Sequence, residues 1–252
     1  MKLLLLGTGE AFEADNFGNN AALLYGKNIP TVLFDCGYQI PERFWQYKKH
    51  VRKLECIYIT HLHADHCFGL APLLTYYLEE NRQDPLTIIG PTGIKRLITR
   101  LSQQAYPSTL KKIPFKLIFI ELPTGGTHAF KNLNFKTARS EHSVKNLSVR
   151  VTGPQQKNFC ISGDGNLTKA TKKLFAGTDL LLHEVYFPQP MGPNHCDLQT
   201  LRAYLDTAGI KKTIATHTSR HYRQTIKKLL CKNLTDHKCQ LVFGTPQTIL
   251  SL

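Results

Sequence analysis

The segment from Thr60 to Gly69 constrains this chain more than any other. It reads THLHADHCFG and follows an apolar run, Cys56–Ile59, that predicts a buried strand. Three histidines and an aspartate fall within six residues, at the predicted turn from this strand into a helix. Burying four such groups without partners would be costly, whereas imidazole and carboxylate groups are good zinc ligands. The segment therefore predicts a metal site at the end of a strand.

Short apolar runs and amphipathic stretches alternate along the whole chain, which predicts an α/β fold. The predicted strands are Lys2–Leu6, Ala21–Tyr25, Thr31–Phe34, Cys56–Ile59, Leu86–Ile89, Phe115–Ile120, Leu147–Val151, Asn158–Ile161, Leu180–Leu182, Thr213–Ala215 and Gln240–Phe243. The predicted helices are Pro41–Lys49, Phe68–Glu79, Gly93–Gln104, Leu167–Leu174, Leu198–Thr207 and Tyr222–Leu230. The sequence shows no repeat or linker, so we expect one domain over residues 1–252.

Composition narrows the class of protein. With 42% apolar and 20% charged residues among 252, the chain has enough hydrophobic material for a core, which excludes a largely disordered protein. No apolar run approaches the roughly 20 residues that span a bilayer. The seven cysteines form no C-x-x-C pair, which argues against a disulfide framework. We therefore expect a cytoplasmic protein with no membrane partner.

The formal net charge of +14 favours an anionic partner. The basic residues nevertheless occur in small scattered groups, and each group by itself is typical of a solvated helix face. Charge alone therefore does not identify the partner.

The metal-site segment, continued through Leu70, resembles the T-H-x-H-x-D-H-x-x-G-L motif of the metallo-β-lactamase superfamily. Three further residues of that pattern follow in the expected order: His142, Asp164 and His217. The resemblance implies an αββα sandwich, in which two mixed sheets are flanked by helices and a dinuclear centre lies along one edge. It implies two divalent metal ions, with zinc expected and manganese or iron as alternatives. The implied ligands are His61, His63 and His142 for one metal, Asp65, His66 and His217 for the other, and Asp164 between them.

Other segments resemble the ribonuclease Z branch of this superfamily. Asp35-Cys-Gly37 is similar to a motif whose acid orients a liganding histidine, and residues 217–222, HTSRHY, resemble the closing H-F-S-x-R-Y pattern. The segments LLLHEV, which contains Glu184, and NHCD, which contains His195, resemble two further motifs of the ribonuclease Z branch. A phosphodiester has a poor alkoxide leaving group that an acid should protonate, and His195 assisted by Glu184 suits that role. His183 and His221 are expected to be structural.

Two segments by which bacterial ribonuclease Z binds tRNA have no counterpart in this sequence. Only residues 143–163 separate His142 from Asp164, which leaves no room for the long basic arm of that branch. The P-x-K-x-R-N loop near the N-terminus is also missing, and the acidic stretch 10–20, EAFEADNFGNN, takes its place. The catalytic residues therefore resemble those of ribonuclease Z, while the known tRNA contacts do not.

These observations predict a dinuclear-metal-dependent phosphodiester hydrolase that acts on a small phosphodiester or cyclic nucleotide. A metal-bridging hydroxide, assisted by Asp65, is expected to attack phosphorus. The first alternative is a tRNA 3′-processing endoribonuclease, because the positive charge leaves RNA open as a partner. The second is a catalytically idle metal-binding module, which the complete ligand set disfavours. Carbon-ester or thioester hydrolysis is a lesser alternative, and the resemblance further suggests a homodimer.

Overall fold

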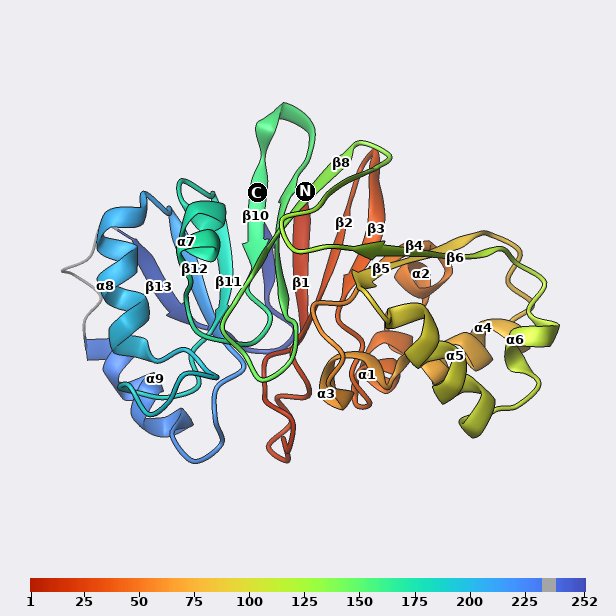
Figure 1. Ribbon diagram of the computed structural model, residues 1–252, viewed down its shortest axis with the longest axis horizontal. Helices are drawn as coiled ribbons and strands as arrows, with labels where there is room; N and C mark the ends of the chain where they lie inside the picture. Colours follow the sequence, from red (N-terminus) through yellow and green to blue (C-terminus); the bar gives the residue numbers. More distant parts are fainter. Residues whose placement is uncertain (233–238) are drawn as a thin grey trace.

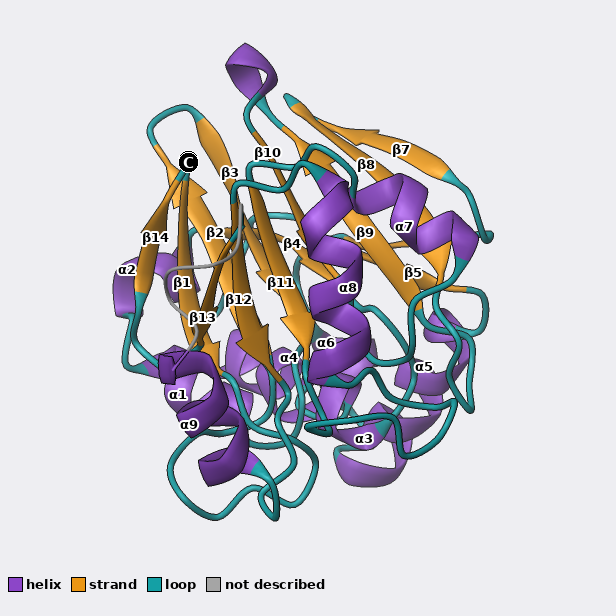
Figure 2. Cartoon of the chain, turned by 90° about the vertical axis from the view of Figure 1, so that its left-hand side faces the viewer, coloured by secondary structure: helices purple, strands orange, loops and turns teal. Residues whose placement is uncertain are grey.

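The computed structural model describes residues 1–232 and 239–252. Two seven-stranded sheets lie face to face, with helices on both outer faces, as Figures 1 and 2 show. The first sheet has the order β14 (Ile249–Ser251), β1 (Lys2–Gly7), β2 (Ala21–Gly26), β3 (Ile29–Phe34), β4 (Leu54–Tyr58), β5 (Leu86–Pro91) and β6 (Leu117–Leu122). The second has the order β13 (Gln240–Phe243), β12 (Lys212–Thr216), β11 (Leu180–Glu184), β10 (Asn158–Ile161), β9 (Leu147–Thr152), β8 (Leu133–Arg139) and β7 (Thr127–Phe130). The predicted αββα sandwich is confirmed.

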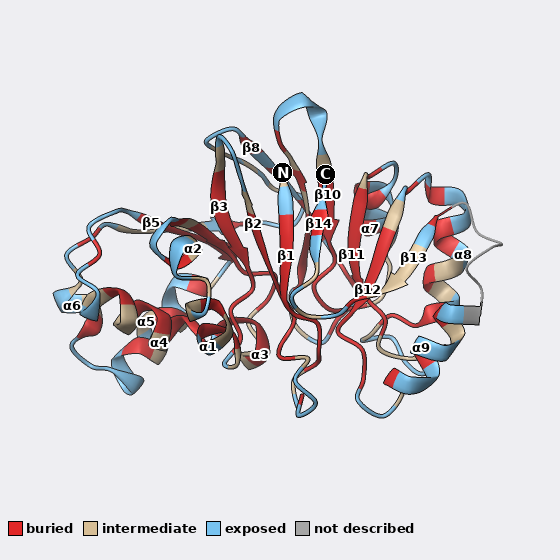
Figure 3. Cartoon of the chain, turned by 180° about the vertical axis from the view of Figure 1, so that it is seen from behind, coloured by how far each residue is buried: buried red, intermediate tan, exposed pale blue. Residues whose placement is uncertain are grey.

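The hydrophobic core has three layers because each sheet buries both of its faces, as the buried strands in Figure 3 show. Between the sheets, aromatic side chains such as Phe34, Tyr58, Phe135 and Phe159 are fully or almost fully buried. Outside the first sheet pack α1 (Ile40–Trp45), α2 (Lys48–Arg52), α3 (Ala64–Cys67), α4 (Leu70–Glu79), α5 (Ile94–Ala105) and α6 (Thr109–Lys112). Outside the second pack α7 (Lys169–Phe175), α8 (Leu198–Ala208) and α9 (Arg223–Lys232). Among the described residues, no helix is long and apolar enough to cross a membrane.

Some predicted element boundaries were wrong for local reasons. The helix expected over Pro41–Lys49 is divided into α1 and α2, because Tyr47 has the non-helical angles φ −100° and ψ 56°. Likewise, the helix expected from Phe68 begins at Leu70, with the separate turn α3 before it. Strands β7, β8 and β14 were not predicted from the sequence. Strand β8 places the polar Asn134 and Lys136 on its exposed face, so its apolar content is low.

Strand direction brings the chemically interesting loops to one edge. Strands β3 and β4 are parallel, as are β10, β11 and β12, so the loops after these strands emerge at the same end. Strand β8 runs in the same direction as β10, because both are antiparallel to the intervening β9. In Figure 1 this is the lower edge of the sandwich. The residues that follow these strands meet there.

Candidate metal centre

The first group of metal-ligand side chains comes from three loops. His61 and His63 follow β4, His142 follows β8, and Asp164 follows β10. One donor atom from each of these four residues lies within 4.8 Å of the others. The His63 Nδ1 atom is 3.2 Å from His61 Nε2 and 3.2 Å from His142 Nε2. Three imidazole nitrogens therefore face one small volume, with a carboxylate beside them.

The second group adjoins the first through Asp164. Asp65 and His66 come from α3, and His217 follows β12. His66 Nε2 lies 3.2 Å from Asp65 Oδ2 and 3.3 Å from Asp164 Oδ1. His217 Nε2 lies 3.4 Å from Asp65 Oδ2 and 3.4 Å from Asp164 Oδ2. Asp164 thus belongs to both groups and lies between them.

Unsatisfied atoms and local charge indicate that these groups fit bound cations. His66 Nε2 and Asp164 Oδ1 are buried and only 3.3 Å apart, yet they form no well-directed hydrogen bond with each other or with any other atom of the described residues, which is costly unless another ligand satisfies them. Burial lowers the pKa values of His61 and His63 and favours the neutral imidazole that binds metal. Burial opposes charge on His217 too, but Asp164 and other carboxylates outweigh it and raise its pKa to about 10. The surroundings of Asp164 therefore favour a positive charge, whether on a protonated histidine or on a bound metal ion.

Asp35 orients two of the histidines from behind. Its Oδ2 atom accepts a hydrogen bond from His66 Nδ1 at 2.8 Å, and its Oδ1 accepts one from the Thr60 amide at 2.8 Å. The Thr60 hydroxyl lies 2.9 Å from Asp35 Oδ2 and 3.0 Å from His61 Nδ1. These contacts engage Nδ1 of both histidines and leave Nε2 of each facing the metal-ligand groups. Asp35, which the resemblance implied as an orienting acid, thus contacts His66 directly and His61 through Thr60.

The backbone of Asp164 is held by residues that were not identified from the sequence. The Asn146 side chain accepts a hydrogen bond from the Asp164 amide and donates to the Ser162 carbonyl and the Ser140 hydroxyl. Ser140 in turn donates to the Asp164 carbonyl at 2.5 Å. Asn146 is fully buried, so its amide is committed to this network. No local motif marks it, because its partners come from other strand ends.

Glu184 and His195 form a pair next to the metal-ligand groups. The His195 Nδ1 atom lies 2.9 Å from Glu184 Oε2, while Glu184 Oε1 accepts hydrogen bonds from the amides of Gly165 and Cys196. Burial opposes ionisation of Glu184, but hydrogen bonds from His195 and His217 outweigh it and lower the carboxyl pKa. Partial burial opposes the charge of His195, and Glu184 reverses this effect and raises its pKa. The pair therefore favours an ionised acid and a protonated imidazole.

Aromatic rings complete the surroundings of His195. Tyr186 stacks on His195, with ring centroids 4.2 Å apart and an angle of 20°. The His142 ring lies 5.1 Å from the His195 ring, so the candidate acid directly adjoins the first metal-ligand group. Tyr186 was not identified from the sequence, although it lies only two residues after Glu184. By contrast, His183 is buried with its Nδ1 donating to a backbone carbonyl, and His221 is exposed.

The β1–β2 loop has an acidic sequence, but two of its acidic side chains are buried and do not form an acidic surface. Glu10 and Glu13 are almost fully buried, and each is paired with an arginine that follows β12. Glu10 Oε1 accepts a hydrogen bond from Arg220 at 2.6 Å, and Glu13 pairs with the buried Arg223. The loop is therefore largely neutralised, and it exposes the ring of Phe12.

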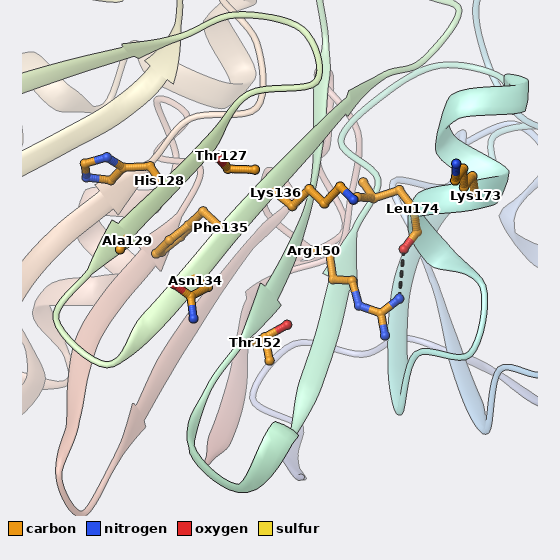
Figure 4. A pocket seen from close by; sticks show the side chains of 10 residues that line it. All are labelled: Thr127, His128, Ala129, Asn134, Phe135, Lys136, Arg150, Thr152, Lys173 and Leu174. Atoms are coloured by element: carbon orange, nitrogen blue, oxygen red, sulfur yellow. Dashed lines mark hydrogen bonds between the residues drawn. The ribbon is translucent and has the colours of Figure 1, made fainter.

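A separate hollow of about 680 Å³ lies on the outer face of the second sheet, between β7, β8, β9 and α7 (Figure 4). Its lining includes Lys136, Arg150 and Lys173 and, within the described residues, no acid. The Arg150 guanidinium donates to the carbonyls of Leu174 and Ala176 and to Asn158 Oδ1. None of the candidate metal ligands that meet at the strand-end edge is among the described residues that line this hollow, so the hollow is separate from that site.

Known proteins resemble this chain in sequence and in fold. A ribonuclease Z from Geobacillus kaustophilus is 26% identical over 279 residues, covering 88% of this chain and 90% of the relative. Human tRNase Z, short form, superposes with a TM-score of 0.80 at 23% identity, covering 100% of this chain and 99% of that one. The metallo-β-lactamase fold protein YhfI from Bacillus subtilis has a TM-score of 0.80 at 18% identity, covering 99% of this chain and 98% of that one.

The fold is therefore that of the metallo-β-lactamases, and it is shared with human tRNase Z, short form. The family model described as anti-Pycsar protein Apyc1 matches residues 1–240, nearly the whole sequence. With that match, the chain belongs to the anti-Pycsar protein Apyc1 family.

Proposed function

We propose that this chain is a metal-dependent phosphodiester hydrolase of the ribonuclease Z-like type, and that its substrates are small phosphodiesters, cyclic nucleotides among them. One observation carries the proposal. Two groups of candidate metal ligands share Asp164, and the Glu184–His195 pair lies beside them and forms a third group of close donor atoms with Asp164 and His217. Cations held by the two groups would stabilise negative charge on the phosphoryl oxygens, and the Glu184–His195 pair would donate a proton to the leaving oxygen.

The ligand sets follow from the two groups. His61, His63 and His142 would hold one cation, Asp65, His66 and His217 the other, with Asp164 between them. Zinc suits this set of imidazoles and carboxylates best, and manganese or iron are the alternatives. Two bound cations supply an activated water and neutralise charge on the phosphoryl oxygens.

Asp65 is suited to accept a proton from the attacking water. Burial opposes its charge, but the adjacent His66 and His217 outweigh that effect and hold the pKa of Asp65 below its usual range. The carboxylate is therefore ionised at neutral pH. Its Oδ2 atom is shared between the two histidines, which fixes its position within the site.

His195 is suited to protonate the leaving oxygen. Glu184 engages its Nδ1 atom, so Nε2 is the nitrogen left to donate a proton to a substrate. The side chain is 24% exposed, whereas Glu184 is fully buried. Substrate can thus reach the imidazole but not the carboxylate that keeps it charged.

The connection between β9 and β10 favours a small substrate. It is a short turn around residues 154–156, so no long arm extends from this part of the site. The alignment with the Geobacillus relative is longer than this chain, which means that the relative has residues without a counterpart here. RNA 3′ processing is the second candidate, because that relative is named ribonuclease Z and this chain carries a net charge of +14.

One assay separates the two candidates. The zinc-loaded protein is given a precursor tRNA, a 3′,5′-cyclic nucleotide and a chromogenic phosphodiester under the same conditions. Cleavage of the two small substrates without cleavage of the precursor is the expected result. Specific cleavage of the precursor at its 3′ end would favour the processing enzyme instead. Inactivity on all three, with two metals bound, would contradict hydrolysis and favour an idle metal-binding module. Size-exclusion chromatography tests the homodimer that the ribonuclease Z resemblance suggests.

A further inference from the structure

The loop between β1 and β2, whose Thr8 carbonyl accepts a hydrogen bond from the His217 amide, places one aromatic side chain in solvent. Phe12 is 71% exposed, more than any other large hydrophobic side chain of the described residues. In Figure 1 this loop projects below the sheet edge, between α3 and the segment that precedes α9, and Figure 3 shows its exposed tip. The ring is therefore accessible to a molecule that binds at this edge of the sheets.

The ring is supported on one side by a positioned cation. The Arg220 guanidinium carbon lies 5.3 Å from the centroid of the Phe12 ring, within the range of a cation–π contact. Arg220 is held in turn by a 2.6 Å ion pair with Glu10, whose carboxylate is 1% exposed. The second Glu10 oxygen accepts a hydrogen bond from the Phe12 amide at 2.9 Å. One buried carboxylate therefore fixes both the arginine and the backbone that carries the ring.

The loop is attached to both halves of the sandwich around the site. On one side, the Tyr38 hydroxyl donates a hydrogen bond to the Ala11 carbonyl, and Tyr38 follows Gly37, which packs against the backbone of Asp65. On the other side, the His217 amide donates to the Thr8 carbonyl at 2.8 Å. The backbone on either side of Phe12 is thus attached to the loop that precedes α1 and to the loop that carries His217.

Tyr186 connects this feature to the candidate acid. Its ring stacks on His195 and lies 5.8 Å from the ring of His217, centroid to centroid. Arg220 lies three residues after His217, in the loop that begins on this side of the site. It occupies a variable position of the H-F-S-x-R-Y pattern, whose own arginine is replaced here by His221.

We propose that Phe12, backed by Arg220, is a stacking platform for the nucleobase of a phosphodiester bound at the metal centre. Every nucleobase has a π face, so the platform would accept different bases without reading their edges. Its outer face is open to solvent, while Arg220 occupies the other side. This inference rests on the proposed function, since it names the part of the substrate that lies outside the reacting phosphate.

The first test uses two substrates with the same leaving group. Thymidine 5′-(4-nitrophenyl phosphate) carries a base, and methyl 4-nitrophenyl phosphate carries none. Phe12→Ala should lower kcat/KM for the thymidine ester about tenfold, mainly through KM, because a base–aromatic stack contributes roughly that much binding. The methyl ester should change less than about twofold.

Matched variants distinguish stacking from general disturbance. Phe12→Tyr should keep the wild-type preference, and Phe12→Leu, which is apolar but has no π face, should behave like Phe12→Ala. Tyr106→Ala removes another exposed aromatic side chain, in the segment after α5, and should change neither substrate. Equal losses on both esters, or no loss on either, would overturn the proposal.

A binding measurement separates this inference from the proposed hydrolysis. Trp45 is the chain's one tryptophan, so Trp45→Phe combined with Phe12→Trp gives a protein whose fluorescence reports on position 12. Thymidine 5′-phosphate should quench this fluorescence, and inorganic phosphate at the same concentration should not. Quenching without hydrolysis of either ester would reject the function and keep the platform. Hydrolysis without quenching or substrate preference would reject the platform and keep the function, and the absence of both would reject both.

Discussion

His195 Nδ1 lies 2.9 Å from Glu184 Oε2, and that same carboxylate oxygen lies 3.4 Å from Nδ1 of His217. One buried acid therefore contacts both the candidate proton donor and a candidate metal ligand. It also accepts two backbone amides through its other oxygen, which leaves little freedom to move. The Glu184 side chain thus sets the position of the candidate proton donor, His195, relative to the candidate metal ligand His217.

Replacing His195 should affect substrates according to their leaving group. His195→Ala removes the proton donor, so cleavage of an alkoxide-leaving phosphodiester should slow by about 10²–10⁴-fold. A nitrophenolate leaves without protonation and should be affected much less. Parallel kinetics on the two substrates measure the difference, with the exposed His221→Ala as control. Equal losses on both substrates would remove His195 from the acid role.

Glu184 should set the alkaline limit of activity. Partial burial lowers the pKa of His195, but the hydrogen bond and charge of Glu184 raise it above the ordinary 6.5. A donor must be protonated, so activity on an alkoxide-leaving substrate should fall as the pH rises through this raised pKa. Glu184→Gln keeps an oxygen for the two amides but removes the charge, and should move that fall to lower pH. A pH profile of kcat/KM tests this, and an unmoved alkaline limb would contradict it.

Asp35 should influence metal affinity without binding metal. It accepts hydrogen bonds from His66 and Thr60, and Thr60 contacts His61, so the acid orients ligands of both groups. Asp35→Asn should weaken metal binding by about 10–100-fold, as is typical when a ligand's orienting partner is lost. Competition with a chromogenic chelator measures the affinity, and Asp84→Asn, at an exposed position, is the control. Unchanged affinity would exclude an orienting role.

The two kinds of ion pair in this chain should contribute differently to stability. Arg223 is 4% exposed and pairs with the buried Glu13, so Arg223→Ala leaves an unpaired buried carboxylate and should cost about 3–5 kcal/mol of unfolding free energy. Lys211 pairs with Asp179 but its side chain is 73% exposed, so Lys211→Ala should cost at most about 1 kcal/mol. Urea denaturation of both variants tests the contrast. Similar losses would show that burial of the pair is not what matters.

The sequence by itself determined the fold class and the residues with metal-ligand chemistry. The THLHADH segment places four of them within a few residues of one another, and a strand followed by a helix is readable from apolar periodicity. His142, Asp164 and His217 were identified because they resemble a known pattern in the correct order. Glu184 and His195 were identified in the same way.

Only the tertiary structure decided how these residues meet and what surrounds them. Asn146 positions Asp164, and Tyr186 stacks on His195, through contacts that no local spacing encodes. The stretch 10–20 reads as acidic, yet Glu10 is neutralised by Arg220, which is 210 residues away in the chain. The physical reason is that strand order and direction bring the loops together at one edge, and a charge in a sequence does not reveal its partner until the sheets are assembled.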